Sequence, residues 1–280
     1  MRAFAHDAAN HQRIDLCRCG DCNALALEPQ PSQALLNAQY DRYFLRRTED
    51  DPRIKVGYFL WLISRLNLPM DGHRILECGA GEGNLIRALN QRHPTAHITA
   101  VEPLWNSVDS IDVRADVSIL DFDGFLAEYQ GPAFDYVFML DFLEHLPDPR
   151  RALCSLAGRL LNPGAKIIVT TPNADSVGRY VLGPFWPQYK TEHLFYYSRD
   201  SIRELANAAR LETRVLKTHI KRLPLGYLMS VASSFGPKAM QRLSRAISLV
   251  VPATLQQVNV TASFSEWLWV SEWRNAGSRE

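Results

Sequence analysis

The apolar residues from Arg74 onward fall in short, nearly continuous runs that alternate with stretches of helical spacing. The runs are 74–79, 97–103, 112–117, 134–140 and 165–173. Runs of this kind are typical of parallel strands that are buried on both faces. Between them, 84–93 and 149–162 repeat apolar residues with the period of an α-helix, and the NPG at 162–164 is expected to stop the second helix. The pattern predicts a doubly wound α/β core.

The flanking segments extend this core. A helix is expected at 198–210 with Ser198 or Ser201 as its N-cap, followed by a strand at 211–221 and an alternating last strand at 265–274. The whole is then a Rossmann-like seven-stranded sheet with an antiparallel last strand, preceded by helices at about 33–47 and 53–67. The expected organisation is a Cys-containing segment (1–32), N-terminal helices (33–70), the core (71–221), a helical insertion (222–263) and a terminal strand and tail (264–280).

Bulk properties exclude several classes of function. The formal net charge of the 280 residues is +1, so the chain has no global electrostatic basis for binding nucleic acid. The first residues lack the apolar centre of a signal peptide, and no run of about 18 apolar residues is present to span a bilayer. The five cysteines are an odd number and gather mostly at one end, which favours reduced thiols. A cytoplasmic protein is expected.

The most informative stretch is RILECGAGEGNL at 74–85, in which a strand runs into alternating glycines. A turn of this kind lets the backbone approach a ligand closely, because glycine takes positive φ without steric cost. A dinucleotide-binding turn that starts at Gly79 needs glycine at position 84, where this chain has Asn84. The loop also has no Lys or Arg to counter a phosphate. Glu102 follows the next strand, where a carboxylate can accept both hydroxyls of a ribose.

The pattern acid-x-Gly-x-Gly-x-Gly that begins at Glu77, with the acid at Glu102, resembles class I S-adenosylmethionine-dependent methyltransferases from about 72 to 221. The block 134–173 is similar to the subgroup that contains ubiquinone-pathway and sugar or natural-product methyltransferases. It carries FD, LEH, DP, LNPG and PN in that subgroup's order, with Ala165 where a second glycine is more usual. The segment 189–209, with its Glu-His pair and serine-started helix, resembles the same subgroup.

The resemblance implies S-adenosylmethionine as the cofactor. It implies that Glu77 orients the turn or the methionine amino group and that Glu102 holds the ribose. The loop residues expected to lie against the cofactor are Gly79, Ala80, Gly81 and Gly83. Asp116 is the candidate for the adenine amino group, with Asp121 as the alternative and a plain turn residue as the other interpretation of Asp116.

The acceptor side is expected at the carboxyl edge of the sheet, where Asp141, Glu144 and His145 follow the fourth strand of the core. His145 is a candidate general base for a hydroxyl group, and His193 is another. In the alternative interpretation the Glu-His pair packs the loop and caps the following helix. The resemblance to ubiquinone-type O-methyltransferases also implies a divalent cation, Mg²⁺ or Zn²⁺, at Asp141, Glu144 and His145.

The N-terminal CRCGDC contains one zinc-knuckle spacing, Cys19-x-x-Cys22. The run resembles the second half of a zinc ribbon that precedes some sugar methyltransferases, but the first cysteine pair is missing. A closed site would recruit Cys17 with His6 or His11; the alternative is a degenerate ribbon with free thiols. Cys78 and Cys154 are expected in the core.

The segment 213–265 has no Asp or Glu, although it carries several Lys and Arg. Its helical stretch has one apolar face and one basic face. The apolar face has Met240, Leu243, Ile247 and Val250, and the basic face has Lys238, Arg242 and Arg245. The helix resembles an interfacial helix for anionic lipid at the inner membrane face; a lid over the acceptor pocket is the alternative.

Together these features favour a methyltransferase that acts on oxygen of a small or lipid-linked acceptor, such as a glycan precursor, a quinone-like ring or a natural product. The alternative is a non-catalytic module that binds the cofactor or a partner. A nicotinamide-dependent enzyme is opposed by Asn84.

Overall fold

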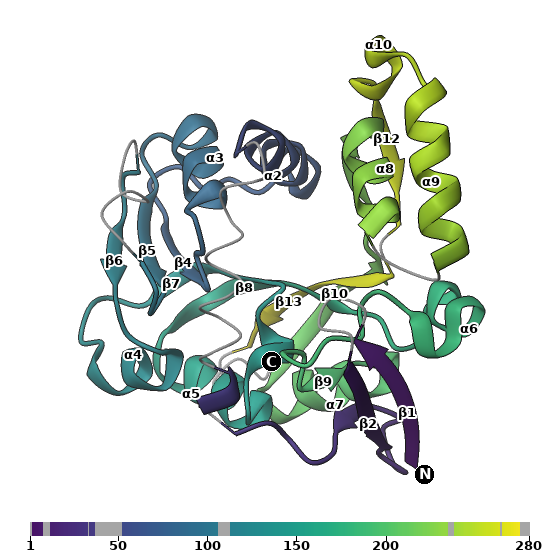
Figure 1. The fold of residues 1–280 in the computed structure, drawn as a ribbon. Coiled ribbons are helices and arrows are strands. Elements are labelled where there is room, and N and C mark those ends of the chain that lie inside the picture. Colours follow the sequence, from purple (N-terminus) through teal and green to yellow (C-terminus); the bar gives the residue numbers. More distant parts are fainter. Residues whose placement is uncertain are drawn as a thin grey trace. The chain divides into compact units, whose positions relative to one another are not determined.

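The computed structural model describes residues 2–7, 12–32, 34–36, 52–105, 113–234, 238–263 and 265–274 (Figure 1). The chain divides into two compact units, each assembled from separate stretches. We call the stretches 55–171, 199–217 and 267–280 the core unit, and 1–54, 172–198 and 218–266 the accessory unit. Each unit has its own hydrophobic core.

The core unit is built on a seven-stranded sheet in the order β10-β13-β8-β7-β4-β5-β6. The strands are β4 (Arg74–Cys78), β5 (His97–Val101), β6 (Asp116–Ser118), β7 (Phe134–Leu140), β8 (Leu161–Pro172), β10 (Leu211–Thr218) and β13 (Glu266–Trp273). The pairs β4 with β5, β4 with β7, β5 with β6 and β7 with β8 are parallel. The predicted Rossmann-like sheet with an antiparallel last strand is confirmed.

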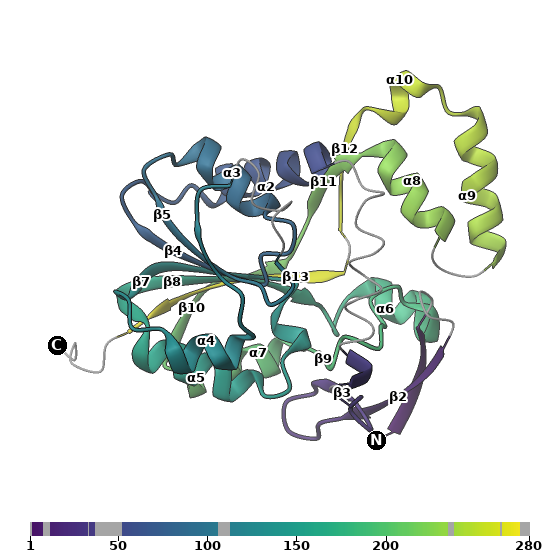
Figure 2. The same cartoon turned by 60° about the vertical axis from the view of Figure 1, so that its left-hand side comes forward.

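Helices cover both faces of this sheet. They are α2 (Pro52–Leu66), α3 (Asn84–Arg92), α4 (Phe122–Glu128), α5 (Pro149–Arg159) and α7 (Arg199–Ala208). Figure 2 shows α2 and α3 on one face and α4, α5 and α7 on the other. Ile63 of α2 and Leu89 of α3 pack with Ile75 and Phe138 of the sheet in one buried cluster. Burial of such side chains provides about 1.5 to 3 kcal/mol each, which fixes the strand ends that carry the site.

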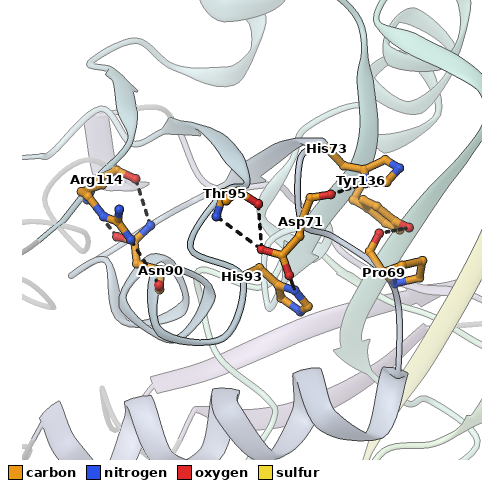
Figure 3. Close-up of polar contacts among 8 residues, drawn as sticks. All are labelled: Pro69, Asp71, His73, Asn90, His93, Thr95, Arg114 and Tyr136. Atoms are coloured by element: carbon orange, nitrogen blue, oxygen red, sulfur yellow. Dashed lines mark hydrogen bonds and ion pairs between the residues drawn. The ribbon is translucent and has the colours of Figure 1, made fainter.

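Two expected boundaries are wrong. The third strand was expected at 112–117, but β6 begins only at Asp116. The backbone of Arg114 instead pairs with the Asn90 side chain, with its N–H donating to Oδ1 at 2.9 Å and its carbonyl accepting from Nδ2 at 3.1 Å (Figure 3). The helix expected at 149–162 ends at Arg159, and the NPG at 162–164 lies within β8.

Residues next to the amino ends of the strands form a second set of polar contacts (Figure 3). The Asp71 carboxylate accepts from Thr95 Oγ1 at 2.9 Å and lies 3.0 Å from His93 Nδ1. The Tyr136 hydroxyl donates to the Pro69 carbonyl at 3.0 Å. The Asp71 contacts tie the loop before β4 to the loop before β5, and the Tyr136 contact ties the loop before β4 to β7. Each of these polar groups has its partner within the core unit. We therefore interpret the contacts as stabilising the fold rather than binding a ligand.

The accessory unit contains a four-stranded sheet in the order β1-β2-β3-β9. Its strands are β1 (Arg2–Asp7), β2 (Gln12–Arg18), β3 (Leu25–Leu27) and β9 (Phe195–Tyr196), and α6 (Val177–Leu182) and η3 (Gly183–Phe185) precede β9. The buried Asp7 carboxylate accepts from the N–H and hydroxyl of Thr191 at 2.8 and 2.9 Å. The sequence interpretation did not foresee strands in 1–32. The helix expected at 33–47 falls almost wholly outside the described residues, except that 34–36 are helical.

The expected insertion at 222–263 is mainly helical, as predicted. It consists of α8 (Leu225–Ser234), α9 (Lys238–Val250) and α10 (Ala253–Gln256). Two strands that were not foreseen, β11 (Lys221–Pro224) and β12 (Asn259–Ala262), pair antiparallel and close it. Across the described stretches of the chain, none of the helices is both long enough and apolar enough to cross a membrane.

Candidate active site

The glycine turn follows β4 and leads into α3. Gly79, Gly81 and Gly83 have φ of 75°, 56° and 74°, a region that L side chains rarely adopt. A Cβ on Gly79 would lie 2.7 Å from the Phe142 ring, and a Cβ on Gly83 would lie 2.8 Å from the Trp105 ring. Both the backbone conformation and the packing therefore require glycine at these two positions.

Glu102 connects this turn to the end of β5. Its Oε2 accepts from the Gly81 N–H at 2.7 Å, and its Oε1 accepts from the Leu104 N–H at 3.2 Å. The Gly79 and Ala80 N–H groups donate to the Val101 carbonyl at 2.8 and 3.3 Å, so three hydrogen bonds join the turn to the end of β5. An ionised carboxylate has about four acceptor positions, and the backbone occupies two of them. The remaining positions suit the paired hydroxyls of a ribose.

Glu77 is buried within β4, one strand away from Glu102 in the sheet. Burial raises the pKa of the Glu77 carboxyl well above its usual value, and the nearby Glu102 charge raises that pKa further. Among the described residues, no hydrogen-bond partner reaches Glu77 Oε2. A buried carboxylate oxygen without a donor is costly, and a bound ammonium group would satisfy it. Glu77, the glycines and Glu102 therefore fit the amino group and ribose of S-adenosylmethionine.

The structure places Asp116 differently from the expectation. Asp116 was expected at the carboxyl end of the third strand, but it opens β6 and pairs with Thr99, two residues before the end of β5. Asp121 lies three residues beyond the carboxyl end of β6. Its Oδ1 accepts from the Gly124 N–H at 2.7 Å and caps α4. Of the two candidates for the adenine amino group, the position favours Asp121.

Asp141 follows β7 in the left-handed region, with φ of 52°. Its N–H donates to the Thr170 carbonyl at 3.0 Å, and its Oδ1 accepts from the Thr170 hydroxyl at 2.8 Å. This reciprocal pairing fixes the start of the loop against β8. In the left-handed region an Asp is tolerated better than an aliphatic residue, because its short polar side chain can form local hydrogen bonds.

Glu144 and His145 lie in a short helical turn, η2 (Leu143–His145). The Glu144 carboxylate is fully buried and accepts from the Thr171 hydroxyl at 3.0 Å, whereas His145 is half-buried. Ligand atoms of these two residues lie within 4.8 Å of one another. Among the described residues, Asp141 is not grouped with these two ligand atoms. The cation expected at Asp141, Glu144 and His145 stays a prediction.

His193 belongs to the accessory unit and is buried. Its Nδ1 lies 2.9 Å from the Gln188 carbonyl oxygen, which can only accept, so Nδ1 carries the proton of the neutral ring. The Gln188 side chain donates to Glu266 Oε1 at 3.1 Å, and Lys221 Nζ lies 2.8 Å from the same oxygen. The hydrogen bond to the Gln188 carbonyl selects the tautomer whose Nε2 can accept a proton, and the Glu266 contact holds the Gln188 side chain.

The sequence interpretation missed several residues of these two regions. Phe142 and Trp105 pack against the glycine turn, and Gln188 and Glu266 support His193. The only signal in the sequence for the two aromatic residues was that they are close to predicted site residues. Phe142 lies inside DFLEH, and Trp105 lies three residues after Glu102. Gln188 and Glu266 carry no motif, and their pairing across the chain is visible only in the fold.

Cys19 and Cys22 lie in the turn between β2 and β3. The Cys19 N–H donates to the Ala24 carbonyl at 2.9 Å, and N–H groups of Cys22 and Asp21 lower the pKa of the Cys19 thiol. Cys17, Cys19 and Cys22, all within the described residues, are not joined by disulfides. Of the proposed further ligands, His11 lies outside the described residues, and only the backbone of His6 is described. Zinc at Cys19 and Cys22 stays a prediction.

Comparison with known proteins decides the family. A family model described as a methyltransferase domain matches residues 38–214, more than half of the chain. The chain belongs to this methyltransferase-domain family. The predicted class, an S-adenosylmethionine-dependent methyltransferase, is thereby confirmed at the level of the family.

The relatives of this methyltransferase-domain chain share only part of their length with it. It is 34% identical over 113 residues to a ubiquinone biosynthesis O-methyltransferase of Xylella fastidiosa (strain 9a5c), covering 38% of this chain and 44% of that protein. It is 28% identical over 174 residues to the enzyme of the same name from Idiomarina loihiensis, covering 57% and 70%. The chain therefore spans less than half the length of the Xylella relative.

A solved structure supports the fold. The 1,6-didemethyltoxoflavin-N1-methyltransferase of Burkholderia thailandensis, with bound 1,6-didemethyltoxoflavin and S-adenosylhomocysteine, matches with a TM-score of 0.55. The match covers 98% of this chain and 100% of that one at 14% identity. At this identity the similarity concerns the fold alone.

Proposed function

We propose that the chain transfers a methyl group from S-adenosylmethionine to an oxygen atom of a quinone-like or lipid-linked acceptor. The observation that supports this proposal most strongly is the hydrogen bond from the Gly81 amide to Glu102, next to the buried Glu77, whose Oε2 has no hydrogen-bond partner among the described residues. Oxygen and a quinone-like ring are favoured by the relatives, whose name is ubiquinone biosynthesis O-methyltransferase. A glycan precursor or another natural product is the remaining choice of acceptor.

Different residues of the site have different roles in the proposed reaction. S-adenosylmethionine, when bound, supplies the methyl group, whose bond to sulfur breaks as the new bond to oxygen forms. Glu77 and Glu102 bind and orient the amino group and the ribose, and the glycines let the backbone approach. His193 or His145 accepts the proton of the acceptor hydroxyl. Most of the rate advantage in this account comes from holding the reactants in a near-attack geometry with little water present.

Calorimetry and turnover together test this proposal against a non-catalytic module. The full chain is titrated with S-adenosylmethionine and is then incubated with the cofactor and catechol-type quinol precursors, with S-adenosylhomocysteine as the readout. Binding together with acceptor-dependent product supports the enzyme. Binding without product from any quinol, lipid or glycan fraction supports the module instead, and absence of binding contradicts both.

We propose the divalent cation as a separate element of the site, at Asp141, Glu144 and His145. If the cation is required for turnover, exhaustive chelation abolishes activity, and Mg²⁺ or Zn²⁺ restores it. Full activity of the chelated enzyme leaves the three residues as loop scaffold and base.

We also propose a cytoplasmic enzyme that associates peripherally with the inner face of the membrane. The support is the segment 213–265, which has no acidic residue. A lipid-linked acceptor would be reached most directly by an enzyme at that surface.

A further inference from the structure

Helix α9 packs in the accessory unit through its polar side. Gln241, Ser244 and Ser248 form a half-buried stripe along one side of the helix. The Ser244 hydroxyl donates to the Met229 carbonyl of α8 at 3.0 Å. Gln256 of α10 donates to the Ser248 carbonyl at 3.3 Å. The side that faces α8 and α10 is therefore held by hydrogen bonds.

The apolar side of the same helix is exposed. Leu243, Ile247 and Val250, which we call the apolar stripe, have exposed fractions of 62%, 42% and 77%. Leu255 and Val258, which follow in the chain, are exposed as well. An amphipathic helix of a globular protein normally turns its apolar face inward. This inverted arrangement leaves the large aliphatic side chains of the apolar stripe available to an external apolar phase.

The charge around the apolar stripe has one sign. Arg242 and Arg245 of α9 are exposed, as is Arg222 of β11, and the Arg245 guanidinium also donates to the Ser233 carbonyl of α8 at 3.3 Å. No Asp or Glu occurs between 213 and 265 to balance them. A second copy of the chain docked on this surface would bring like charges together. Anionic lipid headgroups provide the complementary charge.

We infer that α9 lies in the plane of an anionic membrane surface, with the apolar stripe inserted, Arg242 beside it near the lipid phosphates, and Arg245 adding to the positive charge of the same surface. The helix has 13 residues and a length of about 20 Å, enough to lie along the interface. This inference specifies the surface behind the proposed membrane association and does not depend on methyl transfer.

The test is sedimentation of the full chain with vesicles at low salt. One vesicle set is neutral phosphatidylcholine, and the other contains phosphatidylglycerol. The wild type is expected to sediment with the anionic set only. A Leu243→Ser, Ile247→Ser, Val250→Ser variant is expected to lose binding. An Arg242→Gln, Arg245→Gln variant is expected to bind about 30-fold more weakly, the effect of two basic residues at an anionic surface.

Matched controls come from the core unit. Ile119→Ser removes an exposed aliphatic residue, and Arg92→Gln with Arg150→Gln removes two exposed charges, all far from α9 in the chain. Both controls are expected to sediment as the wild type does, and every variant is expected to keep its affinity for S-adenosylmethionine, which shows that it is folded.

Three outcomes overturn the inference. The first is a wild type that ignores anionic vesicles at low salt, and the second is a stripe variant that still binds. The third is a lipid-free wild type that is dimeric while the stripe variant is monomeric, which assigns the stripe to a second copy. Failure of methyl transfer with intact vesicle binding would count against the proposed function alone.

Discussion

Glu102 Oε2 accepts a hydrogen bond from the Gly81 amide at 2.7 Å, so one carboxylate both shapes the glycine turn and lies where a ribose is proposed to bind. We expect Glu102→Ala to weaken binding of S-adenosylmethionine by about 1.5 to 3 kcal/mol, the scale of lost hydrogen bonds to a charged group. Glu102→Gln keeps an acceptor for Gly81 and should lose less. Calorimetry measures both, with Glu128→Ala on the exposed side of α4 as the control. Unchanged affinity in the alanine variant refutes the ribose assignment.

A substitution at Gly79 tests whether the backbone of the turn has to lie close to the cofactor. A Cβ there would meet the Phe142 ring at 2.7 Å while the backbone keeps φ of 75°. We expect Gly79→Ala to lower cofactor affinity at least tenfold, because the turn must shift by about the depth of that clash. Gly158→Ala, in open space on α5, is the matched control. If Phe142→Ala restores affinity to the Gly79→Ala variant, the ring was the obstacle; if it does not, the backbone conformation was.

The two candidate bases are separable by kinetics. If His193 accepts the acceptor proton, His193→Gln lowers kcat by about 10² to 10⁴ and leaves the dissociation constant of S-adenosylmethionine unchanged. His145→Gln then has a small effect, and the exposed His97→Gln has none. The reverse order of effects assigns the proton to His145. A full rate in both variants contradicts a histidine base in this account.

Asp71 gives a prediction on stability. The His93 ring, ahead of the Thr95 donors, lowers the pKa of the Asp71 carboxyl below its ordinary 3.8. A lowered folded-state pKa stabilises the protein above the unfolded value, and this stabilisation is lost as pH falls through the folded value. We therefore expect Asp71→Asn to lower the Tm at pH 7 and the difference from wild type to shrink below about pH 4. A difference that grows in acid contradicts the assignment.

The sequence predicted the parts of the fold that depend on local patterns. Apolar runs such as 134–140 match strands because a strand buried on both faces needs them. The start of β6 was wrong because the Asn90 amide takes the backbone groups of Arg114, a contact without a sequence signature. Strands β1 to β3 were missed because β3 is completed by β9, far away in the chain.

The candidate site was predicted to a similar extent. Glu77, Glu102 and the glycines follow from spacing, since strand ends and tight turns are set locally. The support of His193 by Gln188 and Glu266 was not predictable, because it joins segments that are distant in sequence. Phe142 over Gly79 likewise depends on two parallel strands being neighbours in the sheet.

The most direct test of the central claim is methyl transfer from S-adenosylmethionine that carries a deuterated methyl group. The wild type and the Glu102→Ala variant are each incubated with the lipid fraction of a cell extract, and the products are identified by mass spectrometry. The account predicts a labelled methoxy group on a quinone-like or lipid-linked molecule, formed by the wild type and strongly reduced in the variant. A labelled nitrogen or carbon, or no labelled product from any fraction, would contradict it.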